Sequence, residues 1–128
     1  MQHILIANGV NLDLLGRREP EIYGHKNLNE LEKYITNEID KLTQALKISP
    51  PKLSFYQTNS ETDYLNKLSE YPYDAIIVNP GAWSHSSIAL ADRLIAINIP
   101  YIEVHLSNVS GRENYRKKSF LSKHAQGV

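Results

Sequence analysis

Four short apolar runs, separated by segments with a different periodicity, constrain the fold of this chain more than any other feature. Each run is rich in β-branched or aromatic side chains and is bounded by Gly, Pro or Asn, which is typical of buried β-strands. The runs are His3–Asn8, Lys52–Thr58, Ala75–Asn79 and Tyr101–Ser107. The sequence therefore predicts four strands.

The interval after the first run has the periodicity of a helix. Leucine and isoleucine recur at steps of three and four over Leu28–Leu46, which places them on one face, and Pro50 and Pro51 follow. Because proline cannot continue a helix, we predict a long amphipathic helix that ends before this pair.

Serine residues mark the beginnings of two further helices. Ser60 opens one of them, and Ser86 or Ser87 opens another that extends to Asn98. A serine at this position accepts a hydrogen bond from the first turn of a helix. A shorter basic helix is predicted over residues 111–121.

Alternation of strands and helices predicts the fold class. Crossovers of this length favour a parallel sheet with helices on both faces, so we expect an α/β, flavodoxin-like doubly wound parallel sheet in a single domain, residues 1–128. Ligands bind such sheets at the carboxyl ends of the strands. The longest irregular stretch, residues 9–26, follows the first strand and is expected to contribute to the site.

Composition narrows the possible partners and compartment. The 14 basic and 14 acidic residues balance, so no overall charge favours nucleic acid or a membrane surface. The chain has no cysteine, which excludes disulfides and thiolate metal sites. No run approaches membrane-spanning length, and no secretory leader is evident. We therefore expect a soluble, cytoplasmic protein.

The stretch PYIEVHLSN places Glu103 and His105 on one face of the fourth predicted strand. An ionisable pair is costly inside a sheet, so we expect both residues at the rim, where the strand emerges over the crevice. A carboxylate orients an adjacent imidazole and stabilises its protonated form, which suits a general acid. A structural ion pair fits these residue types equally well.

Other candidate site residues can also be interpreted either as functional or as purely structural. His85 precedes a predicted helix, where it could contact a ligand or cap the helix. A zinc site with His105 lacks a closely spaced ligand pair. Arg18 could stabilise the phenolate of Tyr23 and make it a base, or both could belong to an ordinary charged loop. Arg116 or Arg112 could hold an anionic or hydroxylated substrate, or both could face solvent.

Asparagine and serine residues follow three of the predicted strands. They include Asn8, Asn11, Asn79, Ser107 and Asn108. Their convergence would suit a polyhydroxylated or carboxylated small molecule.

The sequence has no Walker loop and no G-x-G-x-x-G, and residues 9–26 contain no Ser or Thr to cradle a flavin phosphate. This disfavours a flavodoxin-like binding module, which is one alternative to an enzyme; a structural assembly protein is another.

Four blocks extend these observations to a known family. NGVNLDLLGRREPEIYG, FYQTNSE, IIVNPGAWSHSSIALAD and IPYIEVHLSNVSGRENYRKKSFLS resemble, in order and spacing, the signature blocks of the type II 3-dehydroquinate dehydratases. The resemblance implies a flavodoxin-like hydro-lyase that converts 3-dehydroquinate to 3-dehydroshikimate by anti elimination, without metal or cofactor. It further implies a homo-oligomer in which trimers form a dodecamer.

Matching positions imply roles for individual residues. Tyr23 would be the base, Arg18 the transition-state stabiliser and His105 the proton donor, with Glu103 orienting His105. Asn11 would hold a water against the enolate oxygen. The substrate hydroxyls and carboxylate would be bound by Asn79, His85, Leu106, Ser107 and Arg116, and Asp92 would reach into a neighbouring subunit's site.

The chain departs from the family pattern at Val10, Asp13, Tyr56 and Ala91, none of which is a catalytic position. Type II enzymes also continue past the position of Val128 into a final strand and helix, which the resemblance leads us to expect are absent here.

Overall fold

A four-stranded, fully parallel sheet organises the chain, which a computed structural model describes over residues 1–17, 19–106 and 113–128. The strands are β1 (His3–Asn8), β2 (Lys52–Gln57), β3 (Ala75–Asn79) and β4 (Tyr101–Glu103). All four predicted strands are present. The fourth ends at Glu103, so the predicted strand over Tyr101–Ser107 is wrong at 104–106, and Ser107 lies outside the described residues.

The order of the strands positions the crevice. It is β2-β1-β3-β4, so the chain crosses from β1 to one side of the sheet and later returns to the other side. Asn8 lies opposite Asn79, and Val78 lies opposite Glu103, which brings the carboxyl ends of β1, β3 and β4 to one edge. This is the order and switch point of a flavodoxin-like sheet, as predicted.

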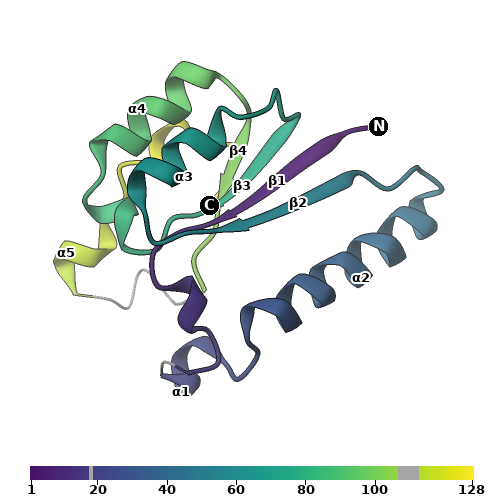
Figure 1. The fold of residues 1–128 in the computed structure, drawn as a ribbon, viewed down its shortest axis with the longest axis horizontal. Helices are drawn as coiled ribbons and strands as arrows, with labels where there is room; N and C mark the ends of the chain where they lie inside the picture. The colour runs from purple at the N-terminus through teal and green to yellow at the C-terminus, as the bar shows by residue number, and fades with distance from the viewer. Residues whose placement is uncertain (18, 107–112) are drawn as a thin grey trace.

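Helices flank both faces of the sheet. Figure 1 shows α3 (Glu61–Leu68) and α4 (Ile88–Ile97) on one face and α2 (Leu28–Leu46) on the other. The side chains of Ser60 and Ser87 accept hydrogen bonds from the first turns of α3 and α4, which confirms the predicted starts. The remaining short helices are η1 (Leu12–Leu14), α1 (Pro20–Tyr23), η2 (Gly81–His85), α5 (Asn114–Lys117) and η4 (Ser122–His124).

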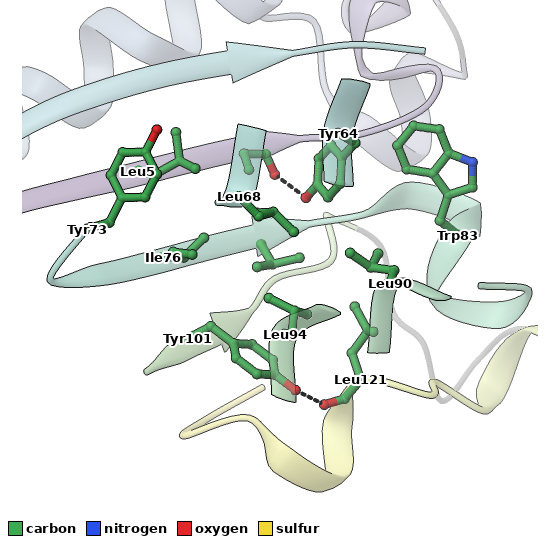
Figure 2. Close-up of a cluster of buried hydrophobic side chains, with 12 residues drawn as sticks. Leu5, Tyr64, Leu68, Tyr73, Ile76, Trp83, Leu90, Leu94, Tyr101 and Leu121 are labelled. Atoms are coloured by element: carbon green, nitrogen blue, oxygen red, sulfur yellow. Dashed lines mark hydrogen bonds between the residues drawn. The ribbon is translucent and has the colours of Figure 1, made fainter. Parts of the chain in front are cut away.

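The two faces of the sheet are covered unequally. On the face of α3 and α4, a closed core joins Leu5, Ile76 and Tyr101 of the sheet to helical residues such as Tyr64 and Leu94 (Figure 2). On the other face, Leu42 and Leu46 of α2 remain 54% and 58% exposed, and Ile102 of β4 is 47% exposed. The close packing that holds the site therefore comes from the first face.

Buried phenols tie this core together. The Tyr64 hydroxyl donates to the carbonyl of Ala7, 2.8 Å away, and the Tyr101 hydroxyl donates to the carbonyl of Leu121 at 2.5 Å (Figure 2). The second bond attaches the carboxyl-terminal segment to β4. Gly127 extends this attachment, since it bridges Ile102 in parallel register.

The predicted basic helix over residues 111–121 is largely wrong. In its described part only Asn114–Lys117 is helical, and Lys118 has the extended values φ −86° and ψ 130°. The backbone after α5 bonds to other elements instead: the Phe120 amide donates to the carbonyl of Ser84. Within the described ranges, no helix is both long and apolar enough to cross a membrane.

Candidate active site

A cavity of about 150 Å³ lies at the carboxyl edge of the sheet. Its walls come from the loops that follow β1, β3 and β4, together with α5. The lining residues are Val10, Asn11, Leu12, Leu15, Asn79, Gly81, Ala82, His85, His105, Leu106 and Arg116. Six residues singled out from the sequence are thus brought together: Asn11, Asn79, His85, His105, Leu106 and Arg116.

Two special backbone positions shape the cavity. Gly81 has φ +61°, and a Cβ atom there would lie 2.7 Å from the carbonyl oxygen of Val10. Asn11 has φ 69°, a left-handed conformation that asparagine tolerates better than most residues, and its amide donates to the Asn59 side chain. Gly81 thus lets the loop after β3 pack against the loop after β1, and the Asn11 bond joins the loop after β1 to the loop after β2.

His105 forms an ion pair with Glu103 at the base of the cavity. The His105 Nε2–H donates to Glu103 Oε1 over 2.8 Å, and the two side chains are only 6% and 0% exposed. Glu103 is therefore not at the rim, as the sequence analysis expected, but completely buried behind His105. The ring's other nitrogen, Nδ1, is the one left to act on a bound molecule.

Glu103 is a buried carboxylate whose donors include His105 and two serines. Ser119 Oγ donates to Oε1, and Ser122 Oγ donates to Oε2 at 2.5 Å. Burial alone raises the pKa of Glu103, but the hydrogen bonds from His105, Ser119 and Ser122, with the charge of His105, outweigh burial and hold that pKa below its ordinary value. The pair is thus suited to keep a negative charge beside the imidazole.

The nearby Tyr101 phenol responds to the same environment. Burial, and then the charge of Glu103, raise the pKa of Tyr101. Tyr101 consequently stays a neutral hydrogen-bond donor and does not compete as a base.

His85 presents a second imidazole to the cavity. Its Nδ1 lies 2.7 Å from the carbonyl oxygen of Lys118, which can only accept, so Nδ1 carries the proton. In the neutral ring Nε2 is then an acceptor, suited to a substrate hydroxyl. The rings of His85 and His105 are stacked, with centroids 6.5 Å apart. Ser87, not His85, caps α4, so the helix-capping interpretation of His85 is wrong.

The remaining polar groups give the cavity an anion-binding character. Asn79, which is buried, contributes an amide from the end of β3. Arg116 contributes a guanidinium from α5, where Glu113 lies 3.8 Å from its Nε. A cation, two imidazoles and two amides around one small volume suit a hydroxylated carboxylate.

Some predicted site residues are not brought to the cavity. Asp92 is exposed on α4 and does not line it. Arg18, Ser107 and Arg112 lie outside the described residues. Tyr23 ends α1, but its side chain is not among those described. Their predicted roles remain predictions.

Several residues of the site were missed by sequence reasoning. The apolar wall of Val10, Leu12 and Leu15 could have been expected from the position of the loop after β1. Ser119 and Ser122 had no such signal, because their partner Glu103 lies 16 and 19 residues away along the chain.

The donor set does not resemble a metal centre. Among the residues that the structure describes, no three His, Cys, Asp or Glu side chains are grouped so that they could hold a metal ion. A zinc site on His85 and His105 would lack a third ligand in that part of the chain.

Comparison with known proteins agrees with this geometry. The Dehydroquinase class II family model matches residues 2–128. The chain belongs to the class II dehydroquinase family. It is 46% identical to a 3-dehydroquinate dehydratase of Proteus mirabilis, over 98% of this chain and 82% of the relative. Another 3-dehydroquinate dehydratase, from Clostridium botulinum, is 45% identical over 100% of this chain and 84% of the relative.

Solved structures of class II dehydroquinases share the fold. A type II dehydroquinase from Butyrivibrio crossotus superposes with a TM-score of 0.82 at 37% identity, covering 98% of this chain and 85% of that one. One from Propionibacterium acnes gives a TM-score of 0.84 at 35% identity, covering 99% and 84%. The family resemblance read from the four sequence blocks is therefore confirmed.

Proposed function

We propose that this class II dehydroquinase is a 3-dehydroquinate dehydratase, a hydro-lyase that forms 3-dehydroshikimate and water. The observation that carries the proposal is the His105–Glu103 pair at the cavity of a chain from this family. An imidazole held by a buried carboxylate is the acid that such an elimination needs. The two relatives above bear the name of this activity over nearly the whole chain.

The first step in the proposed mechanism is removal of a proton next to the substrate ketone. Tyr23, as phenolate, takes the proton, and the C–H electron pair moves toward the ketone oxygen to give an enolate. Arg18 stabilises the phenolate and the developing charge, and Asn11 holds a water against the enolate oxygen. The assignment of these three residues rests on the family resemblance, to which the place of Asn11 on the cavity wall adds support.

The second step expels the hydroxyl group that is β to the ketone. The enolate electrons re-form the carbonyl, a carbon–carbon double bond forms, and the carbon–oxygen bond breaks. His105 gives its proton to the departing oxygen, which leaves as water. As the family resemblance implies, proton removal and water loss take place on opposite faces of the substrate, which makes the elimination anti.

Substrate binding is proposed to use the rest of the cavity. Asn79 and His85 contact hydroxyl groups, and Arg116 pairs with the carboxylate. Leu106 and Ser107 add backbone and hydroxyl donors to that carboxylate. This scheme assigns no step to a metal ion or an organic cofactor.

Assembly into trimers, and of trimers into a dodecamer, is part of the proposal. Ile88, Asp92 and Ile95 recur at helical spacing on α4, and the two isoleucines are 60% and 48% exposed. An apolar face around one carboxylate suits a subunit contact at which Asp92 reaches a neighbouring site. We further propose one catalytic domain over residues 1–128, acting in the cytoplasm, since a chain without cysteine needs no oxidising compartment.

The direct test is to mix the protein with 3-dehydroquinate and follow the ultraviolet absorbance of the conjugated enone product. We expect absorbance to rise with wild type and to rise far more slowly with His105→Ala at equal folded concentration, checked by circular dichroism. A folded wild type that forms no enone would contradict the proposal, and a yellow protein carrying flavin would favour the binding-module alternative.

A further inference from the structure

The segment Lys118–Ser122 bonds to both histidine-bearing parts of the cavity. Each of its residues is engaged: the Lys118 carbonyl accepts from His85, the Phe120 amide donates to Ser84, and the Leu121 carbonyl accepts from Tyr101. Ser119 and Ser122 supply the two remaining bonds, both of them to Glu103. The segment is thus a strap across η2 and β4.

The direction of the Ser119 bond follows from its neighbours. Ser119 Oγ accepts a hydrogen bond from the Leu121 amide at 3.1 Å, so its own proton is available for Glu103 Oε1. A carboxylate only accepts. The hydroxyl therefore donates to the charged form of Glu103.

Ser122 has a simpler environment. Its hydroxyl lies 2.5 Å from Glu103 Oε2, the oxygen that His105 does not contact. Glu103 itself is 0% exposed. Removing the hydroxyl would take from this oxygen the donor that the described part of the chain supplies, which is costly for the charged form of a buried carboxylate.

We propose that Ser119 and Ser122 are positioning residues that keep Glu103 ionised and so keep His105 aligned for proton donation. Neither serine touches the cavity; both act through Glu103. The proposal rests on the function proposed above. The titratable groups that face Glu103 are His105, in direct contact, and Tyr101, with His85 stacked behind His105.

The proposal predicts a particular kinetic signature. Ser122→Ala, Ser119→Ala and the double variant should lower kcat while KM stays within about twofold, because substrate binding does not use these hydroxyls. Loss of a donor lets Glu103 take up a proton more readily. The acid-side fall of kcat should therefore begin at higher pH, by about one unit for each hydroxyl removed.

Matched controls separate this role from general loss of a hydroxyl. Ser54→Ala removes a serine hydroxyl that bonds to His3 on a neighbouring strand, and its pH profile should match wild type. Ser122→Thr retains the hydroxyl and should restore the wild-type profile. Ser122→Ala is the cleaner deletion, because Ser119 also supports the Leu121 amide and its loss could disturb the strap itself.

A measurement without substrate keeps the proposal separate from the proposed function. Carbon-13 NMR of glutamate-labelled protein follows the Glu103 carboxyl, with Glu103→Gln identifying its signal. We expect its titration to move to higher pH in Ser122→Ala and further in the double variant. If wild type makes no enone, the proposed function fails while this titration still tests the serines. An unmoved Glu103 titration in folded Ser122→Ala would overturn the proposal, as would an unmoved pH profile in an active one.

Discussion

Replacing Glu103 by glutamine tests whether the buried carboxylate tunes His105 or merely fills space. Glutamine keeps the shape of the side chain but removes its charge. Because Oε1 accepts from His105 and Ser119 while Oε2 accepts from Ser122, one amide group cannot accept at both ends. The variant therefore loses charge assistance at three hydrogen bonds and must reorient at least one of them.

The expected magnitude follows from the bond to His105. A hydrogen bond to a charged group is worth about 1.5–3 kcal/mol. If that stabilisation is felt fully in the transition state, its loss lowers kcat by about 10- to 150-fold. Removing the acid itself in His105→Ala should cost more, about 10²- to 10⁴-fold. KM should change little, since Glu103 is completely buried and cannot touch substrate.

The losses of activity and of stability in Glu103→Gln should depend on pH in a defined direction. The pKa of Glu103 is held below its ordinary value of 4.5, so its charge contributes to stability above that pH, and the contribution is lost as the pH falls through the lowered pKa. Below that pKa, wild type also carries a neutral residue 103. The difference in their free energies of unfolding should shrink as the pH falls below 4.5, and the ratio of wild-type to Glu103→Gln activity should shrink as the pH falls through the lowered pKa of the folded protein.

Stopped-flow enone formation and urea unfolding, each from pH 3.5 to 8 where the proteins remain folded, measure the two quantities. The reasoning would be refuted by a Glu103→Gln enzyme with wild-type kcat at neutral pH. A difference in free energy of unfolding that stays constant from pH 8 to the lowest pH would refute it as well, because the loss would then not depend on the charge. Either result would leave Glu103 as a structural residue of the strap.

Four further outcomes are expected. Tyr23→Phe should reduce kcat by about 10²-fold or more with substrate binding nearly unchanged, measured by calorimetry; substantial residual turnover would remove Tyr23 from the role of base. Activity should survive EDTA, and also borohydride in the presence of substrate, whereas inactivation by borohydride would indicate a Schiff-base lysine. Gly81→Ala should destabilise the fold by about 1–3 kcal/mol in urea, because of its positive φ and its contact with Val10; an unchanged midpoint would contradict that strain. Asp92→Ala should raise KM or weaken assembly while the monomer stays folded, which light scattering at assay concentration can check; a fully active monomer would exclude a borrowed Asp92.

Local pattern was sufficient to predict most of the fold. The strands β1, β2 and β3 and the serine caps of α3 and α4 follow from side chains within a few residues of each other. The residue at which β4 ends does not follow from its near neighbours in the sequence. Its sequence keeps alternating through His105, but β4 ends its pairing with β3 near Val104, where the amide still bonds to Val78. The residue at which a strand ends depends on how far its partner strand pairs with it, and the alternation of side chains within one strand contains no information about that.

The cavity residues were predictable to the extent that they follow strand ends. Asn79, His85 and His105 occupy the positions at which any parallel sheet of this order presents its loops. The burial of Glu103 was not predictable in this way. Rim placement was expected because an isolated carboxylate is costly inside a sheet. From the strand alone, His105 is the partner that Glu103 can be expected to have, whereas its two other donors, Ser119 and Ser122, come from a later segment.

The same segment explains why its own conformation was mispredicted. Over residues 118–121 the basic pattern favours a helix, and a helix would satisfy these backbone groups internally. The structure instead leaves the helical conformation at Lys118, which has extended values of φ and ψ, and uses the Lys118 carbonyl for His85 of η2 and the Leu121 carbonyl for Tyr101 of β4. In this arrangement Ser119 and Ser122 bond to different oxygens of one carboxylate. Helical propensity is worth only tenths of a kcal/mol per residue, so several long-range hydrogen bonds, one pair of them to a buried charge, decide the outcome. The conformation of the strap is thus set by the ion pair it supports.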